Sequence, residues 1–327
     1  MSGDWALELD LERSQAAARE TRARIAGFIR QTPLLELDEG EDGVIRALKL
    51  ETLQRGGAFK IRGAASALTA GEPPRAVVAA STGNHGLAVA IVARALGVPC
   101  RVFVPASAAP AKLARLRAAA GVEVVEVEGD PLLAELAARE ASEREPGTLL
   151  VPPYNDARVV LGQATLGLEL LEQASQPPEA LYVAVGGGGL ISGIALAVRT
   201  RWPQCRIVGC VPAASPAMAA AVAAGAVVAA AVEPTLSDAT AGGIEQGAIT
   251  VAICAALVDE FATLAEAEIA AAMRLALLEH SLAIEGASAL ALAASLRDGA
   301  RSGRRHLVVL GGGNVGAQTL RGILREI

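Results

Sequence analysis

Short apolar runs alternate with segments of helical spacing through most of the chain. Each run ends in a loop rich in Gly, Ser or Pro, and apolar residues three and four positions apart follow that loop. The runs predict buried strands and the spaced segments predict helices, an alternation typical of an α/β fold with parallel strands and right-handed crossovers. The predicted strands cover residues 34–37, 48–51, 77–80, 101–105, 122–127, 181–185, 206–211 and 306–310. The predicted helices cover residues 11–29, 61–68, 87–96, 111–120, 131–143, 162–173, 190–199, 265–279 and 284–296.

A proline-containing segment over 151–156 marks a boundary between two α/β units. The regular alternation that begins near Pro74 predicts a small α/β domain over residues 74–146. It is inserted into a larger domain that both ends of the chain build, over residues 1–73 and 147–327.

The alanine-rich run over 216–232 is long enough to suggest a membrane span. Alanine is only weakly hydrophobic and Gly225 interrupts the run, so we expect a packed helix followed by a strand or loop. Residues 1–11 carry three acidic side chains and no basic segment before an apolar one. A signal peptide is therefore not expected.

Composition narrows the class of protein. The 327 residues are 52% hydrophobic and 20% charged, with a net charge of -6, as in an ordinary globular protein with ample core material. A mildly acidic chain predicts no nucleic-acid partner and no binding to anionic membranes. The four cysteines lie in apolar surroundings without metal-ligand spacing. We therefore expect reduced, buried thiols, no metal site and a cytoplasmic location.

Lys60 is the first candidate for chemistry. It lies where a Gly-rich loop meets a predicted helix, beside Phe59, one of four phenylalanines in the chain. Burial among apolar neighbours lowers the pKa of an ammonium group and makes the neutral amine a nucleophile toward an aldehyde. A lysine at this place can also be the first exposed residue of a helix.

Gly186, Gly187, Gly188 and Gly189 lie between a predicted buried strand and a helix. Residues without Cβ allow backbone N–H groups to converge at a helix N-terminus, which suits a phosphate. The run matches neither common nucleotide-binding pattern, and it can also be a tight turn that needs glycine.

A polar loop follows the strand over 77–80, at the usual position of ligands in open α/β sheets. It contains Ser81, Thr82, Gly83, Asn84 and His85. Hydroxyl, amide and backbone N–H groups suit a substrate carboxylate and a phenolic oxygen, although Ser, Thr and Asn also cap helices. The histidine can be a base or can pack on its own helix. A reactive lysine, a phosphate loop and this polar loop together fit pyridoxal 5′-phosphate, which withdraws electrons from an amino-acid Cα.

Six motifs, read in order, resemble one enzyme family over nearly the whole chain. They are LKLETLQRGGAFKIRGA, STGNHG, PPYNDARVVLGQATLGLEL, VGGGGLISG, IEGASALALAA and LGGGN. They are similar to the fold-type II pyridoxal-phosphate enzymes, in particular the threonine/serine dehydratase and serine racemase group. The resemblance implies a two-domain, tryptophan synthase β-like fold with parallel-sheet-rich domains, helices on both faces of each sheet, and a homodimer.

The resemblance also assigns roles to residues of this chain. It makes Lys60 the Schiff-base lysine, Phe59 a neighbour of the cofactor ring and Asn84 the partner of the ring oxygen. It makes Gly186–Gly189 the phosphate loop, and it gives Glu285 a place near cofactor and substrate. The residues that it places on the loop for the substrate carboxylate are Ser81, Thr82, Gly83 and His85.

Three departures from the family pattern alter these expectations. The family often has a serine whose hydroxyl meets the pyridine nitrogen, and here that cofactor-binding position is Gly311. Many relatives carry Glu-Pro after the strand over 206–211 as part of a divalent cation site, whereas this chain has Val211-Pro212. Biosynthetic threonine dehydratases continue into a regulatory domain. Because this chain ends at Ile327, feedback control of that kind is not expected.

The resulting prediction is a pyridoxal-phosphate-dependent ammonia-lyase, a dehydratase that converts L-threonine or L-serine to a 2-oxo acid and ammonia. Lys60, Thr82 and Glu285 are the predicted catalytic residues, and a small amino acid is the predicted substrate. A serine racemase is the nearest alternative. A dehydratase for 3-hydroxyaspartate or a hydroxyectoine-pathway intermediate is another, and a non-catalytic carrier of the cofactor is an alternative from a different class.

Overall fold

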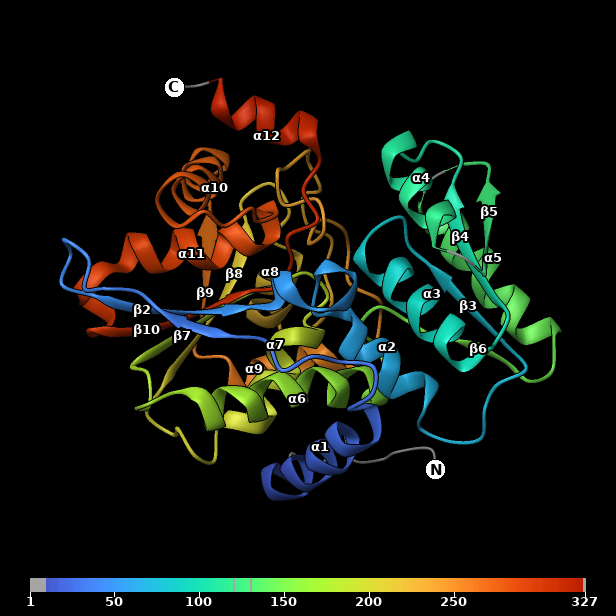
Figure 1. The fold of residues 1–327 in the computed structure, drawn as a ribbon, viewed down its shortest axis with the longest axis horizontal. Coiled ribbons are helices and arrows are strands. Elements are labelled where there is room, and N and C mark those ends of the chain that lie inside the picture. Colours follow the sequence, from blue (N-terminus) through green and yellow to red (C-terminus); the bar gives the residue numbers. More distant parts are fainter. Residues whose placement is uncertain (1–9, 120, 130, 326–327) are drawn as a thin grey trace.

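Two sheets organise the chain in the computed structural model, which describes residues 10–119, 121–129 and 131–325 (Figure 1). The larger sheet has the strand order β1-β2-β10-β7-β8-β9 and the smaller sheet β5-β4-β3-β6. Every neighbouring pair is parallel except β1 with β2. The predicted α/β fold with parallel-sheet-rich domains is confirmed.

The larger sheet takes strands from both ends of the chain. They are β1 (Leu34–Glu36), β2 (Ile45–Leu50), β7 (Ala180–Ala184), β8 (Arg206–Pro212), β9 (Glu260–Leu264) and β10 (Arg305–Leu310). One face of the sheet packs on α6 (Ala157–Gln173), α7 (Gly189–Val198) and α9 (Ile249–Leu257), and the other on α10 (Glu266–His280) and α11 (Gly286–Asp298). Three further helices lie outside these layers: α1 (Leu11–Ile25), α8 (Ala217–Ala224) and α12 (Ala317–Leu324).

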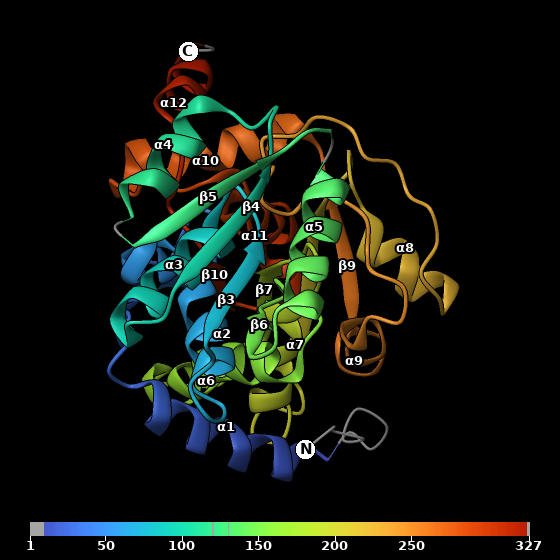
Figure 2. The same cartoon turned by 90° about the vertical axis from the view of Figure 1, so that its right-hand side faces the viewer.

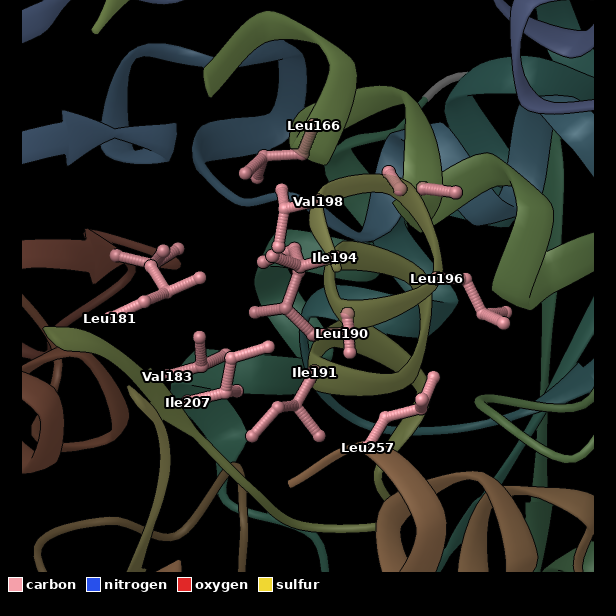
Figure 3. Packing of buried hydrophobic residues seen from close by; sticks show 14 of the residues in the cluster. Leu166, Leu181, Val183, Leu190, Ile191, Ile194, Leu196, Val198, Ile207 and Leu257 are labelled. Atoms are coloured by element: carbon pink, nitrogen blue, oxygen red, sulfur yellow. The ribbon is translucent and has the colours of Figure 1, made fainter. Parts of the chain in front are cut away.

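The interface of the sheet with α7 shows why both elements are almost wholly apolar. Leu181 and Val183 point from β7 toward Ile191 and Ile194 of α7, and all four are fully buried (Figure 3). Strands covered on both faces are expected to have continuous apolar runs instead of alternating ones.

The smaller sheet is built from one continuous part of the chain (Figure 2). Its strands are β3 (Ala76–Ala80), β4 (Cys100–Pro105), β5 (Val122–Val127) and β6 (Thr148–Leu150). One face packs on α3 (Asn84–Leu96) and α4 (Pro110–Ala118), and the other on α5 (Pro131–Arg144). The sequence analysis places the end of the smaller domain at residue 146. Strand β6 begins beyond that residue, at Thr148, and pairs with β3 in the smaller sheet. Helix α2 (Lys60–Leu68) packs on both α3 and α6 and so joins the two units.

Several element boundaries differ from the predicted ones. The first helix ends at Ile25, not at residue 29, because residues 26–28 form a turn in which the Phe28 N–H donates to the Ile25 carbonyl. Helix α6 begins at Ala157, five residues before its predicted start, and Asp156 caps it by accepting from the Arg158 N–H at 2.7 Å. The alanine-rich run forms α8 and then a loop, as expected.

A buried network of four charged side chains lies beneath α2. Arg62 donates to Glu51 at 2.8 Å and to Glu169 at 2.7 Å, and Lys49 donates to Glu169 at 2.6 Å. All four side chains are essentially inaccessible to solvent. Because these bonds join β2, α2 and α6, they fix the helix that begins with Lys60.

The four cysteines are reduced and buried. Burial raises the pKa of Cys100, Cys205 and Cys254 to about 12 and also raises the pKa of Cys210. Across residues 10–119, 121–129 and 131–325, no helix has both the length and the apolar character needed to cross a membrane. Residues 1–9, where no signal peptide is expected, lie outside the described part of the chain.

Candidate active site

One cavity of about 260 Å³ contains all the residues predicted for the site. It lies where β3, β7 and β10 end, at the carboxyl edges of the two sheets. The predicted residues that line it are Phe59, Lys60, Ser81, Thr82, Gly83, Asn84, His85, Gly186, Gly187, Gly188, Gly189, Glu285 and Gly311. Segments that lie far apart in the sequence thus meet at one place.

Lys60 begins α2 and faces the cavity. Its Nζ donates to the Pro153 carbonyl at 2.8 Å and lies 5.3 Å from the centre of the Phe59 ring. Burial lowers the pKa of Lys60 to about 8, and the Glu285 carboxylate opposes part of that shift. About a tenth of the amine is therefore neutral at pH 7, far more than for an ordinary lysine, and the neutral amine is the form that a nucleophile or base requires.

Phe59 and Gly311 lie against each other. The Phe59 N–H donates to the Gly311 carbonyl at 2.9 Å, and a Cβ at position 311 would lie 3.3 Å from Phe59 Cδ1. A Cβ there would require the phenylalanine ring to shift by a few tenths of an ångström. Glycine at this position has no hydroxyl to offer to a pyridine nitrogen.

The polar loop between β3 and α3 is held by its own short contacts. The Gly83 N–H donates to Ser81 Oγ at 3.1 Å, and Gly86 lies so close to the Ser81 carbonyl that a Cβ there would be 2.4 Å from its oxygen. His85 is buried, and its Nε2 lies 2.8 Å from the Val151 carbonyl. Burial, with the nearby Lys60 charge, lowers the pKa of His85 to about 3. The imidazole is therefore neutral, and its Nε2 is engaged by the Val151 carbonyl outside its own helix.

The glycine run turns from β7 into α7. Gly188 has φ +82°, a conformation that favours glycine, and α7 begins at Gly189. A Cβ at Gly187 would lie 2.1 Å from Tyr154 Cδ1, so the loop also needs glycine to pack on that ring. The helix N-terminus beside this loop suits an anion such as phosphate.

Glu285 also lines the cavity. Its two carboxylate oxygens accept from Asn84 Nδ2 at 2.9 and 3.0 Å, and the side chain is 7% exposed. Burial raises the pKa of Glu285, while the hydrogen bond from Asn84 works against that rise. The carboxylate thus orients the amide that the resemblance assigns to the cofactor's ring oxygen.

Among the described residues that line the cavity, four with a charged or amide side chain were not predicted for the site. Lys112 and Arg115 come from α4, Asp238 from the loop before α9, and Asn314 from the loop after β10. Lys112 pairs with Asp238 at 2.7 Å across the opening. Charged residues on a helix usually indicate a solvated face, so the sequence gives no sign that Lys112 and Arg115 lie at the site. Asn314 ends the Gly311–Gly313 run and was the one that could have been found.

The residues present fit pyridoxal phosphate. An amine with a lowered pKa, a glycine loop at a helix N-terminus and an amide beside a carboxylate match the aldehyde, phosphate and ring oxygen of that cofactor. Among the described residues, no group of three or more His, Cys, Asp or Glu side chains is arranged to hold a metal ion.

Comparisons with known proteins agree with this chemistry. An L-threonine ammonia-lyase from Geobacter sulfurreducens is 40% identical over 92% of this chain and 76% of that protein. A serine racemase from Arabidopsis thaliana is 35% identical over 91% of this chain and 92% of that protein. The crystal structure of a threonine deaminase from T.th. superposes with a TM-score of 0.86 at 35% identity, covering 92% of this chain and 98% of that one. The structure of maize serine racemase superposes with a TM-score of 0.87 at 29% identity, covering 95% of this chain and 97% of that one.

The family model for pyridoxal-phosphate dependent enzymes matches residues 25–312, which include every predicted site residue. These neighbours are fold-type II enzymes, as the motifs predict, and the cofactor prediction is confirmed with them. The chain is a member of the pyridoxal-phosphate dependent enzyme family.

Proposed function

We propose that this chain is an ammonia-lyase that removes water from L-threonine or L-serine and releases a 2-oxo acid and ammonia. The observation that carries the proposal is the arrangement of bases at the cavity. Lys60 has a pKa of about 8, whereas His85 is neutral and bonded to Val151, and Glu285 is bonded to Asn84. Elimination takes only one proton from Cα, so a single base is sufficient, and Lys60 can be that base.

The residues of the cavity divide the remaining tasks. The polar loop from Ser81 to Gly83 offers hydroxyl and backbone N–H groups to the substrate carboxylate. Bound pyridoxal phosphate withdraws electrons from the substrate Cα and so lowers the barrier to removing its proton. The proton that Lys60 accepts from Cα can pass to the β-hydroxyl, which leaves as water, and the resulting enamine takes up water to give the 2-oxo acid and ammonia.

Racemisation needs a second proton donor that acts on the other side of Cα. The resemblance places a serine at position 82 in racemases of this group, and this chain has Thr82. The extra methyl group restricts χ1 and occupies space at the cavity. The similarity to named relatives supports both activities, because threonine ammonia-lyases and serine racemases match at comparable identity.

The deciding experiment supplies L-serine and L-threonine to the purified protein and follows both products in one reaction. We expect 2-oxo acid and ammonia as the main products, with D-amino acid as a minor one on chiral chromatography. Formation of D-serine faster than pyruvate would assign the chain to the racemases. If neither substrate reacts, 3-hydroxyaspartate and hydroxyectoine-pathway intermediates are the next to test.

We also propose a homodimer in the cytoplasm, in line with the family resemblance. Light scattering of the purified protein tests the first statement, and a mass equal to one chain at micromolar concentration would contradict it. Fractionation of the source cells tests the second.

A further inference from the structure

A chain of side-chain hydrogen bonds leads from helix α4 to Glu285. Arg115 donates to Asn314 Oδ1, Asn314 Nδ2 donates to Asn84 Oδ1 at 2.6 Å, and Asn84 Nδ2 donates to the carboxylate of Glu285. We propose that Asn314 is a positioning residue, which fixes the orientation of the Asn84 amide in the cavity and ties it through Arg115 to α4.

The amide of Asn84 has two ends that are alike in shape but opposite in hydrogen bonding. Its nitrogen end faces the Glu285 carboxylate, and its oxygen end faces the Asn314 NH₂ group. Reversing the amide would set an oxygen against a carboxylate and an NH₂ group against another NH₂ group. Only one orientation satisfies both neighbours, and Asn314 supplies half of that constraint.

Asn314 is itself held beside the loop that precedes Lys60. Its Nδ2 also donates to the Gly56 carbonyl at 2.8 Å, and the Gly313 N–H donates to the Gly57 carbonyl at 2.9 Å. Gly57 has φ +75°, and a Cβ there would lie 2.3 Å from Asn314 Oδ1. The side chain of Asn314 thus occupies a space that exists because residue 57 is glycine.

The far end of the chain of bonds lies on the smaller sheet's side of the cavity. Arg115 is an exposed residue of α4, and its guanidinium reaches over the cavity to the loop after β10. A change in the position of α4 would therefore alter the donor at Asn314 Oδ1. The orientation of Asn84 is coupled by contact to the placement of the smaller sheet relative to the larger one.

This inference rests on the proposed function only in that Asn84 serves the cofactor, so its test measures cofactor affinity and not turnover. Asn314→Asp keeps the shape of the side chain but replaces the NH₂ donor with an oxygen that cannot donate to Asn84. Pyridoxal phosphate is titrated into the full-length protein after removal of bound cofactor, and binding is followed by the visible absorption band. Losing one partly buried hydrogen bond predicts a dissociation constant about 3- to 10-fold higher and an altered band.

The same substitution is then made in an Asn84→Ala background. If Asn314 acts through Asn84, Asn314→Asp will change the dissociation constant there by less than about twofold, because coupled residues are not additive. An equal factor in both backgrounds would mean that Asn314 only holds the Gly56–Gly57 loop, and it would overturn the proposal.

Arg115→Gln keeps the test available if Asn314→Asp does not fold, since Arg115 is exposed. We expect a roughly twofold loss of affinity in the natural chain and none in Asn84→Ala, as for an exposed polar contact. Arg117→Gln is the matched control, because Arg117 lies on the same helix and pairs with Glu126 within the smaller sheet's unit. An equal effect of Arg117→Gln and Arg115→Gln would contradict the role of Arg115. Any outcome of the lyase and racemase assay leaves these affinity measurements unaffected.

Discussion

The ring of Tyr154 lies directly on Gly187, so that a Cβ at position 187 would be 2.1 Å from Tyr154 Cδ1. The Tyr154 hydroxyl accepts from the Glu245 N–H at 2.8 Å, which fixes the other end of the ring. Tyr154 therefore lines the cavity, and its ring also packs against the glycine loop at Gly187. The glycine loop over residues 186–189 and the segment after β6 depend on each other for their shape.

Gly187→Ala should disturb both the glycine loop and the segment that carries Tyr154. The added methyl group must displace the Tyr154 ring, which predicts a loss of about 1 to 3 kcal/mol in the free energy of unfolding and weaker cofactor binding. Urea denaturation and a cofactor titration measure the two effects. Gly71→Ala is the control, because nothing lies within 4 Å of a Cβ there. Equal stability of the two variants would show that the contact of ring and loop is not tight.

Lys60→Met should make the cofactor-free protein more stable at neutral pH. The folded-state pKa of about 8 lies below the ordinary value of 10.5, so the unfolded chain binds more protons at pH 8 to 10.5. Burial of this lysine thus costs stability, by about 1 to 3 kcal/mol at pH 7, and the cost falls as the pH rises from 8 toward 10.5. Denaturation of both proteins at pH 7 and pH 10 measures the difference. A difference that grows with pH would contradict the lowered pKa.

Lys60→Ala should also abolish the imine absorption band of the protein with cofactor while the protein stays folded. The reason is that Lys60 is the amine at the cavity with a pKa near neutrality. Absorption and circular dichroism spectra of both proteins test this expectation. A yellow Lys60→Ala protein with the natural spectrum would assign the attachment to another amine.

Arg62→Met should be among the most damaging single changes in the chain. It leaves Glu51 and Glu169 buried with one cation fewer, which predicts a loss of about 3 to 5 kcal/mol. Arg144→Gln removes an exposed pair with Glu140 and should cost less than about 1 kcal/mol. Thermal and urea unfolding compare the two variants. A small effect of Arg62→Met would mean that water or other donors replace the guanidinium.

Thr82→Ser tests the proposed activity through the polar loop. The smaller hydroxyl group rotates more freely at the cavity, so the ratio of D-serine to pyruvate should rise while elimination continues. Chiral chromatography of the products from L-serine gives this ratio. An unchanged ratio would show that position 82 does not set the balance of the two reactions.

Patterns of apolar residues predicted most of the parallel strands and their helices, because buried strands must be apolar on both faces. The pattern did not identify α9 and β9, where apolar residues run from Ile249 to Leu264 with few polar breaks and no clear period. It also missed β6, a strand of only three residues. In such segments the tertiary neighbours decide the structure, and these neighbours are not visible in a local window.

The residues of the candidate site also fall into those with a local sequence signal and those that depend on tertiary contacts. Loops between strands and helices carry local signals, and these led to Lys60, Asn84 and the glycine run. Arg115 could not be found, because its role depends on how the smaller sheet faces the larger one. Glu285 was found only through the family resemblance, since its hydrogen bond to Asn84 joins residues 201 positions apart.

The buried thiols allow local unfolding of this chain to be measured by the rate at which each cysteine is labelled. A thiolate is the form that reacts with alkylating reagents, and a pKa of about 12 leaves almost none at neutral pH. Labelling in the folded protein must therefore follow transient exposure. Cys100 lies in the smaller sheet, whereas Cys205 and Cys254 belong to the larger unit. The order in which these sulfur atoms become modified, read by mass spectrometry, would show which unit opens first and whether cofactor closes both together.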